Sequence, residues 1–414
     1  MISKNLKEAY VWIWLPGKTE PVVAGLLSKR DDSRLVFNYG KSYLERSNAI
    51  PIYEPELPLE QGELPLLNDL PMPSCIRDAS PDVWGRRVLL YRSGSLDGNS
   101  FEMDELTCLL ESGSDRIGAL DFQLSPTEYV PRQGAHASLK ELMESAERVQ
   151  QGLPISKALD LALQHGTSIG GARPKVMIES GDKKFIAKFS CSSDFYNVVK
   201  AEYIAMRLAK LVGIDVAPVM LEKTMGKDVL LVERFDRVNS TKGWQRKPMV
   251  SALTILGLGE MQARYASYED LADIIRSRFT DSGHTLRELF SRIVFNILCG
   301  NTDDHARNHA AFWNGRYLTL TPAYDICPQS RTGNEASQAM LIIGQNRMSK
   351  LSVCLEAAHK FQLSINDAQE IIDVQKLGIN EHWGKVCDEA KLSTLESKRL
   401  KGRQFFESIH FRVE

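Results

Sequence analysis

Three side chains with the chemistry of phosphoryl transfer are spaced along residues 300–325 of this 414-residue chain. The segment Gly-Asn-Thr-Asp-Asp-His-Ala-Arg-Asn, residues 300–308, sets Asp303 five positions before Asn308, and Asp325 follows further on. An Asp can take a proton from an attacking hydroxyl, and an Asn with a second Asp can hold magnesium, because hard cations take oxygen ligands. We therefore predict phosphoryl transfer to an alcohol, with Asp303 as the catalytic base and Asn308 and Asp325 as metal ligands.

A predicted hairpin joins the two halves of this group. Asn314-Gly315 lies between the apolar runs Ala310–Trp313 and Arg316–Leu320, which is the strongest short-range hairpin signal in a sequence. A tight hairpin brings its ends side by side, so Asp325 is expected beside Asn308. Asp304 competes for the role of base, but its spacing to Asn308 is four rather than five.

Two other interpretations of the 303–308 segment stay open. Asp and Asn between a helix and a hairpin are ordinary cap and turn residues. His305 and His309, at i and i+4, could share a helix face and bind a metal with Cys299 nearby, although no Glu follows the first His as in zinc proteases.

Upstream, a glycine-rich segment lies between a predicted helix and a predicted strand. It is Ser168-Ile-Gly-Gly-Ala-Arg-Pro-Lys175. Two glycines let backbone N–H groups approach an anion closely, and Lys175 adds positive charge. Neither the P-loop pattern nor the dinucleotide fingerprint is met, so a purely structural turn explains the segment equally well.

A lysine in an apolar strand follows this turn. In Phe185-Ile-Ala-Lys-Phe189 the alternation puts Lys188 on the face opposite Phe185, Ala187 and Phe189. Such a lysine is commonly an edge or snorkelling residue, but this position also matches the kinase lysine that pairs with nucleotide phosphates. Glu202 in the next predicted helix is a candidate partner, and the strand Leu230–Phe235 is placed where an adenine would meet backbone groups.

The elements that position these residues are predicted from apolar periodicity and turn signals. Short apolar runs between Tyr10 and Tyr53 predict a small antiparallel sheet, and residues 121–134 predict a loop or linker. After about residue 250 the pattern becomes helical. Its best segment is Leu286–Cys299, with Thr285 and Glu288 as a capping box and Gly300 as the stop. The predicted fold class is α+β.

Composition excludes several classes of protein. Lys and Arg total 51 against 53 Asp and Glu, a formal charge of −2, so nothing global indicates nucleic acid or a membrane surface. The polar N-terminus lacks the apolar core of a signal peptide, and no apolar run approaches the roughly 20 residues that span a bilayer. Seven scattered cysteines predict reduced thiols in the cytoplasm.

Taken together, the chain resembles the HipA family of bacterial serine/threonine kinases, the toxins of type II toxin–antitoxin pairs. The matching stretches carry the chemistry described above and cover nearly the whole chain: 168–175, 185–188, 232–237, 301–308, 320–325, and in the N-terminal part 78–92 and 106–118. The resemblance implies a bilobal kinase-like fold: an N-terminal β-rich accessory domain over 1–125, a mixed small lobe over 138–248 and an all-helical large lobe over 249–414.

Further roles follow from the resemblance by position. It implies Asp303 as base, Asn308 and Asp325 as Mg²⁺ ligands, and Ser168 as a serine that family members autophosphorylate to inactivate themselves. The residues implied to line the ATP site are Gly170, Gly171, Ala172, Arg173, Pro174, Lys175, Lys188, Glu233, Arg234, Phe235, His305, Arg307 and Tyr324. Asp304 departs from the family pattern, which has Gly there in its best-known members; it could raise the pKa of Asp303 or bind metal.

The expected activity is that of a cytoplasmic ATP- and Mg²⁺-dependent protein serine/threonine kinase. The resemblance implies an aminoacyl-tRNA synthetase as substrate and a small helix-turn-helix antitoxin of HipB type as partner, with DNA contacted only through that antitoxin and no membrane contact. Alternatives are a metal-dependent phosphohydrolase or small-molecule kinase, or a catalytically silent ATP-binding module within a repressor complex.

Overall fold

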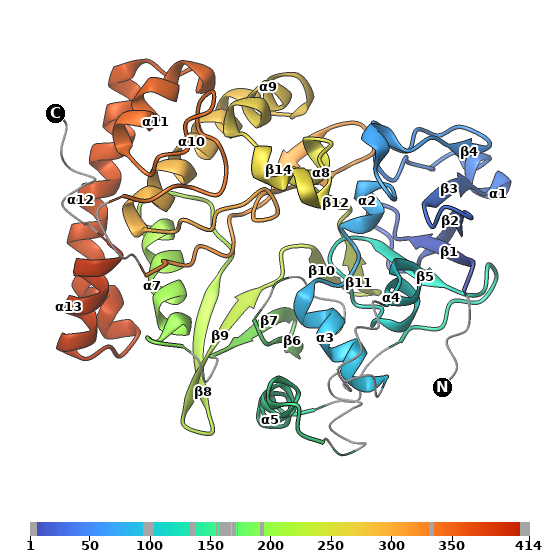
Figure 1. The fold of residues 1–414 in the computed structure, drawn as a ribbon, viewed down its shortest axis with the longest axis horizontal. Coiled ribbons are helices and arrows are strands. Elements are labelled where there is room, and N and C mark those ends of the chain that lie inside the picture. The colour runs from blue at the N-terminus through green and yellow to red at the C-terminus, as the bar shows by residue number, and fades with distance from the viewer. Residues whose placement is uncertain are drawn as a thin grey trace. The chain divides into compact units, whose positions relative to one another are not determined.

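The computed structural model describes residues 6–93, 103–132, 137–154, 156, 167, 171, 173–190, 194–330 and 335–405, whose helices and strands are drawn in Figure 1. The chain forms two compact units, neither of which is one stretch of sequence. The first comprises Met1–Ser193, Lys223–Val250 and Phe312–Arg316. The second comprises Asp194–Glu222, Ser251–Ala311 and Tyr317–Glu414. Helices and strands are mixed along the chain, in keeping with the predicted α+β class.

A five-stranded antiparallel sheet forms the N-terminal part of the first unit, with strand order β4-β3-β2-β1-β5. The apolar runs before Tyr53 predicted its first three strands correctly. The linker predicted over 121–134 is wrong where the fifth strand lies, because pairing with the first strand buries all four of its residues. The strands are β1 (Glu8–Ile13), β2 (Val22–Lys29), β3 (Leu35–Tyr39), β4 (Glu63–Leu64) and β5 (Leu120–Gln123).

Short helices connect and follow these strands. The buried carboxylate of Glu56 accepts hydrogen bonds from the backbone N–H groups of Ser74 and Cys75, at 3.0 and 2.7 Å, and so satisfies two donors at the start of a helical turn. The helices are α1 (Lys41–Leu44), η1 (Leu67–Asp69), α2 (Ser74–Arg77), α3 (Val83–Arg92) and α4 (Glu105–Glu111).

A second sheet has strand order β6-β7-β9-β8. Helices α3 and α5 (Leu139–Gln151) pack on it through a buried apolar cluster that includes Trp84, Leu142 and Phe185. Ser138 and Glu141 form a capping box at the start of α5. The helix predicted before the glycine-rich segment, near 156–165, lies outside the described residues except for Ser156. The strands are β6 (Lys175–Ser180), β7 (Lys183–Phe189), β8 (Val219–Thr224) and β9 (Lys227–Glu233).

Two small sheets complete the β structure. One is a hairpin of β10 (Arg237–Ser240) and β11 (Gly243–Arg246). The other has the order β12-β13-β14, with β12 at Met249–Ser251, β13 at Ala310–Trp313 and β14 at Leu318–Leu320.

The second unit is mostly helical, as expected after residue 250. Among the described residues its longest helix is α12, which packs against α7. At this contact Glu389 binds Arg207 at 3.0 Å and accepts a hydrogen bond from the Tyr203 hydroxyl. No helix among the described residues combines the length and apolarity needed to cross a membrane. The helices are α7 (Val198–Leu211), α8 (Ala252–Ile255), η3 (Glu260–Tyr265), α9 (Tyr268–Arg278), α10 (Ser282–Cys299), α11 (Leu351–Ala357), η4 (Ala358–Phe361), α12 (Ile365–Glu389) and α13 (Thr394–Arg403).

Helix α10 begins earlier than predicted. Asp281, not Thr285, is the N-cap, and its carboxylate accepts from the backbone N–H of His284 at 3.2 Å. The Thr285 hydroxyl instead donates to the Asp281 carbonyl, and Glu288 binds Arg292 at 2.9 Å. The predicted capping box is therefore wrong, because the helix begins at Ser282 and both residues lie inside it.

Candidate active site

The end of α10 fixes where the Asp-containing loop starts. Gly300 has φ of 71°, a left-handed C-cap that favours glycine, as the sequence predicted. Asn301 then donates its backbone N–H to the Asn296 carbonyl at 2.8 Å, which ends the helix. Because twelve residues of α10 are buried, including Leu298 and Cys299, the loop leaves a firmly packed base.

The loop folds back on itself around Asp303. The Asp303 carbonyl accepts from the backbone N–H of His305 at 2.9 Å and from the Asn308 side-chain amide at 3.2 Å. Asn308 also donates its own backbone N–H to the His305 carbonyl at 2.8 Å. The five-residue spacing thus holds the buried Asn308 amide beside the Asp303 backbone, while the Asp303 side chain stays exposed.

The Asn-Gly hairpin returns Asp325 to the same region. Thr321, just past β14, donates to the carbonyl of Ala310 at the start of β13, at 3.0 Å. The Tyr324 hydroxyl donates to the Arg307 carbonyl at 2.7 Å, which ties the returning segment to the loop. Asp325 has φ of 60°, a left-handed conformation unusual for a residue other than glycine.

Electrostatics show that the carboxylates converge. Partial burial raises the pKa of Asp303, His305 lowers it, and the negative charges of Asp325 and Asp304 raise it again. Such mutual repulsion is what a bound cation relieves. No group of three or more His, Cys, Asp or Glu able to hold a metal forms within the described part of the chain. Magnesium fits nonetheless, since it needs only one or two carboxylates beside waters and phosphates.

Two further residues of the loop were predicted to line the nucleotide site. His305 is half-buried, and its Nδ1 atom is buried without a hydrogen-bond partner. Arg307 forms an ion pair with Glu260 of η3. Whether His305 and Arg307 contact a nucleotide stays a prediction.

In the first unit, two lysines lie opposite each other on paired strands. Lys188 of β7 is the Cα partner of Lys175 of β6, and both side chains are buried. Phe185, Ala187 and Phe189 pack in the core on the other face, which confirms the predicted alternation. Two neighbouring positive charges on one face of a sheet suit an anionic ligand. The pairing of Lys188 with Glu202 stays a prediction.

The glycine-rich segment is described only in part. Ser168, Gly170 and Ala172 lie outside the described residues. Gly171 has φ of 103° and donates its N–H to the Asp82 carboxylate at 2.6 Å, and its carbonyl accepts from the backbone N–H of Trp84 at 3.1 Å. Arg173 and Pro174 then lead directly into β6. The Asp82 side chain and the Trp84 backbone, at the start of α3, therefore hold Gly171 in place.

The strand predicted over Leu230–Phe235 is β9, which ends two residues earlier than expected. β9 ends at Glu233, and Phe235 packs edge-on against Phe312 with ring centroids 5.9 Å apart. The Arg234 side chain is buried, which turns it into the protein rather than toward solvent.

Two family descriptions match this chain in succession. The HipA N-terminal domain matches residues 13–123, and the HipA-like C-terminal domain matches residues 167–383, more than half of the chain. The chain belongs to the HipA family.

Relatives of this HipA-family chain carry kinase names. It is 24% identical over 343 residues to the putative kinase Y4mE of Sinorhizobium fredii, covering 76% of each protein. It is 26% identical over 274 residues to the serine/threonine-protein kinase toxin HipA of Shewanella oneidensis, covering 59% of this chain and 60% of that protein. This HipA-family chain is accordingly a kinase.

A solved structure shares the HipA fold. The HipA chain in the complex of Shewanella oneidensis HipA, HipB and operator DNA matches with a TM-score of 0.68 and 19% identity, over 95% of each chain. At that identity the match concerns the fold.

Asp304 has a structural role in this HipA-family chain that sequence reasoning did not assign. Its buried carboxylate accepts from Tyr268, from Asn296 at 2.7 Å and from His309 at 2.9 Å. Burial alone would raise the pKa of Asp304, yet His309 and Tyr268 lower it. His309 is therefore committed to Asp304, and the alternative metal site with His305 is not formed. A signal existed, since Asn296 is a polar residue on the buried face of an apolar helix.

Proposed function

We propose that this HipA-family kinase transfers the γ-phosphoryl group of ATP, with Mg²⁺, to a serine or threonine of a protein. The observations that carry the proposal are the bond from the Asn308 amide to the Asp303 carbonyl and the hairpin after it, which leads to Asp325, whose charge raises the pKa of Asp303. An exposed carboxylate beside two oxygen ligands for a hard cation is the arrangement that phosphoryl transfer to an alcohol requires.

In this proposal Asp303 orients the substrate hydroxyl and accepts its proton. Its raised pKa makes it a better proton acceptor than an ordinary Asp. Asn308 and Asp325 would hold magnesium, which when bound neutralises the charge of the transferring phosphoryl group. The buried Asp304 keeps the loop fixed to α9 and α10, so Asp303 needs little rearrangement before reaction.

The nucleotide would be bound largely by the first unit. Lys175 and Lys188 supply positive charge for its phosphates, and Glu233–Phe235 supply backbone groups for its base. We propose the remaining contacts as the resemblance implies them, from Gly170, Gly171, Ala172, Arg173, Pro174, His305, Arg307 and Tyr324.

The family also guides what is proposed about regulation and partners. Ser168 would be the autophosphorylated serine, the substrate a translation enzyme such as an aminoacyl-tRNA synthetase, and the partner a HipB-type antitoxin through which DNA is contacted. The domain plan proposed is 1–125, 138–248 and 249–414, with the last two as the lobes of a kinase-like fold.

Incubation of the purified chain with γ-labelled ATP and Mg²⁺ tests the proposal. The wild type should label itself at Ser168, and Asp303→Asn should abolish labelling while leaving the melting temperature unchanged. Phosphate release without protein labelling, or full labelling by the Asn variant, would overturn the role given to Asp303.

A further inference from the structure

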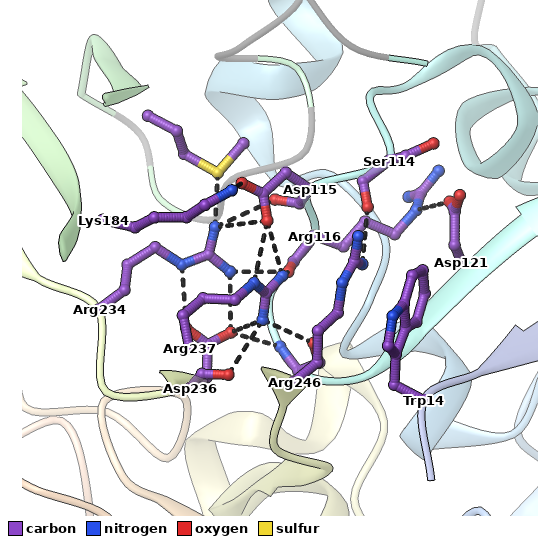
Figure 2. A network of polar contacts seen from close by, with 12 residues as sticks. Trp14, Ser114, Asp115, Arg116, Asp121, Lys184, Arg234, Asp236, Arg237 and Arg246 are labelled. Atoms are coloured by element: carbon purple, nitrogen blue, oxygen red, sulfur yellow. Dashed lines mark hydrogen bonds and ion pairs between the residues drawn. The ribbon is translucent and has the colours of Figure 1, made fainter. Parts of the chain in front are cut away.

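A network of buried charges joins two segments of the first unit that lie over a hundred residues apart (Figure 2). One is the loop Ser114–Gly118, which precedes β5 and is called here the 114–118 loop. The other is Glu233–Arg237, between β9 and β10, called here the hinge segment because it holds the residues proposed to meet the adenine. Both lie wholly within the first unit.

Asp115 is the acid that the loop contributes. Its Oδ1 accepts from Arg237 Nε at 3.0 Å and Nη2 at 2.8 Å, and it lies 3.1 Å from Arg234 Nη1. Its Oδ2 accepts from Lys184 of β7 at 2.9 Å. One carboxylate of the N-terminal region thus binds the hinge segment and the strand beside it.

Backbone groups of the loop add further bonds in both directions. The Arg116 carbonyl accepts from both guanidinium groups, at 2.8 Å from Arg234 and more closely from Arg237. The Gly118 carbonyl accepts from Arg237 at 2.9 Å, while the Gly118 N–H donates to Asp236 at 2.8 Å. The 114–118 loop therefore binds the hinge segment at Arg234, Asp236 and Arg237.

Charge balance makes Asp115 necessary. Arg234 and Arg237 are almost fully buried, and besides Asp115 the carboxylate that contacts them is Asp236. Burial alone would raise the pKa of Asp115, but the two guanidinium charges hold it well below its usual range. Removing one partner from a buried ion-pair group leaves an uncompensated charge, which destabilises the conformation of the segment that carries it.

The Arg234 side chain is consequently not available to a nucleotide. Its guanidinium is bound by Asp236 at 2.9 and 2.8 Å and by the 114–118 loop. We propose that Asp115 is a positioning residue for nucleotide binding: the N-terminal region, through Asp115, fixes the backbone of the hinge segment in the conformation that accepts ATP. This inference rests on the proposed function.

A matched control lies a few residues away. Asp121 is also a buried acid of the N-terminal region, binding Arg116 at 2.9 Å and Arg132 at 2.9 Å. The interactions found for its carboxylate stay within the N-terminal region and do not reach the hinge segment. Asp121→Asn therefore removes a buried charge that reaches the 114–118 loop only through the Arg116 side chain, while the bonds between Asp115 and the hinge segment remain in place.

The test is titration calorimetry of the full-length wild type, Asp115→Asn and Asp121→Asn with a non-hydrolysable ATP analogue and Mg²⁺, alongside their melting temperatures. Asp115→Asn should weaken binding about tenfold, which corresponds to 1.4 kcal/mol, whereas Asp121→Asn should stay within about threefold of the wild type. In steady-state assays the KM for ATP should rise in Asp115→Asn, with kcat at saturating ATP largely kept.

The outcomes separate the two proposals. If the wild type does not bind the analogue, the proposed function and this inference both fail. If the wild type binds and the two Asn variants weaken binding equally, or neither does, the inference alone is overturned. Should Asp115→Asn fail to fold, Arg237→Lys keeps the charge but removes the fork that spans Asp115 and Gly118. Unchanged affinity in that variant would overturn the inference as well.

Discussion

Lys175 and Lys188 are Cα partners on the paired strands β6 and β7, so their side chains leave the same face of the sheet. Both are buried, at 6% and 9% exposure. Cross-strand neighbours of like charge repel each other, and burial strengthens that repulsion because the local dielectric constant is low. The arrangement gathers two positive charges on one face of the sheet, where they suit an anionic ligand.

Replacing Lys188 by Met should therefore separate stability from binding. The melting temperature of the Lys188→Met variant without nucleotide measures what the substitution does to the fold itself. Its affinity for MgATP should fall roughly ten- to a hundredfold, the loss expected for a hydrogen bond to a charged group. Melting curves with and without MgATP measure both effects. Lys227→Met, an exposed position of β9, is the control and should bind as the wild type does.

Substitutions of the adjacent acids Asp303 and Asp304 should affect different properties, activity in the first case and stability in the second. Asp304→Asn removes a buried charge that accepts three hydrogen bonds and should lower the free energy of unfolding by about 1–3 kcal/mol. Asp303→Asn, on an exposed side chain, should leave that free energy unchanged and reduce kcat by about 10²–10⁴. Urea unfolding and labelling rates are the measurements. A stable Asp304→Asn protein would contradict the structural role given to that residue.

Charge introduced at Ser168 should mimic autophosphorylation. A phosphate there adds roughly two negative charges to a segment proposed to embrace ATP phosphates. Ser168→Asp should therefore weaken the binding of an ATP analogue, measured by calorimetry, whereas Ser168→Ala should not. Equal affinities for the two variants would argue against the serine as a regulatory position.

The free energy of unfolding in acid should depend on the ion pairs that Asp236 makes in the hinge segment. Burial alone would raise the pKa of Asp236, but Arg234 and Arg237 lower it to about 2, below the ordinary value of 3.8. Its contribution is fully present above pH 3.8 and is lost as pH falls toward 2, which amounts to about 2 kcal/mol.

The difference in free energy of unfolding between the wild type and Asp236→Asn should accordingly shrink between about pH 4 and pH 2, as measured by unfolding at each pH. Asp31→Asn, at an exposed surface position, should run parallel to the wild type throughout. A constant difference between the wild type and Asp236→Asn would show that the charge of Asp236 does not stabilise the fold.

Packing at the turn of the β13–β14 hairpin can be separated from backbone strain. Gly315 has φ of 97°, and a Cβ there would lie 2.7 Å from Ile50 Cγ2. Gly17 has φ of 73° with nothing within 4 Å of such a Cβ. Both Gly→Ala variants strain the backbone, but Gly315→Ala should be destabilised by about 1–3 kcal/mol more. Equal melting temperatures would show that the Ile50 side chain can move aside at little cost in free energy.

Local patterns predicted the parts whose form depends on near neighbours. The Asn314-Gly315 hairpin, the Gly300 cap and the alternation around Lys188 follow from turn chemistry and from the period of a strand. These features were enough to place Asn308 and Asp325 on either side of one hairpin.

Features that depend on distant partners were missed. Strand β5 is short and carries Asp121 and Gln123, and it becomes a strand because β1 offers it a paired edge. Asp304 was weighed as a competing base or metal ligand, and Arg234 was placed at the ATP site by the family resemblance. Their partners, Tyr268 and Asp115, lie 36 and 119 positions away, and no local period encodes such contacts.

The short segment Phe312–Arg316 belongs to the first unit although the chain on both sides belongs to the second. Trp313 donates from its indole to the Pro51 carbonyl at 2.8 Å and packs edge-on against Tyr53. The first unit therefore lacks one of its buried tryptophans, Trp313, until about three-quarters of the chain has left the ribosome. In a nascent chain that ends before Trp313, we expect the region around Pro51 and Tyr53 to stay incompletely packed. The first unit is then completed only after the 300–308 loop has also been synthesised.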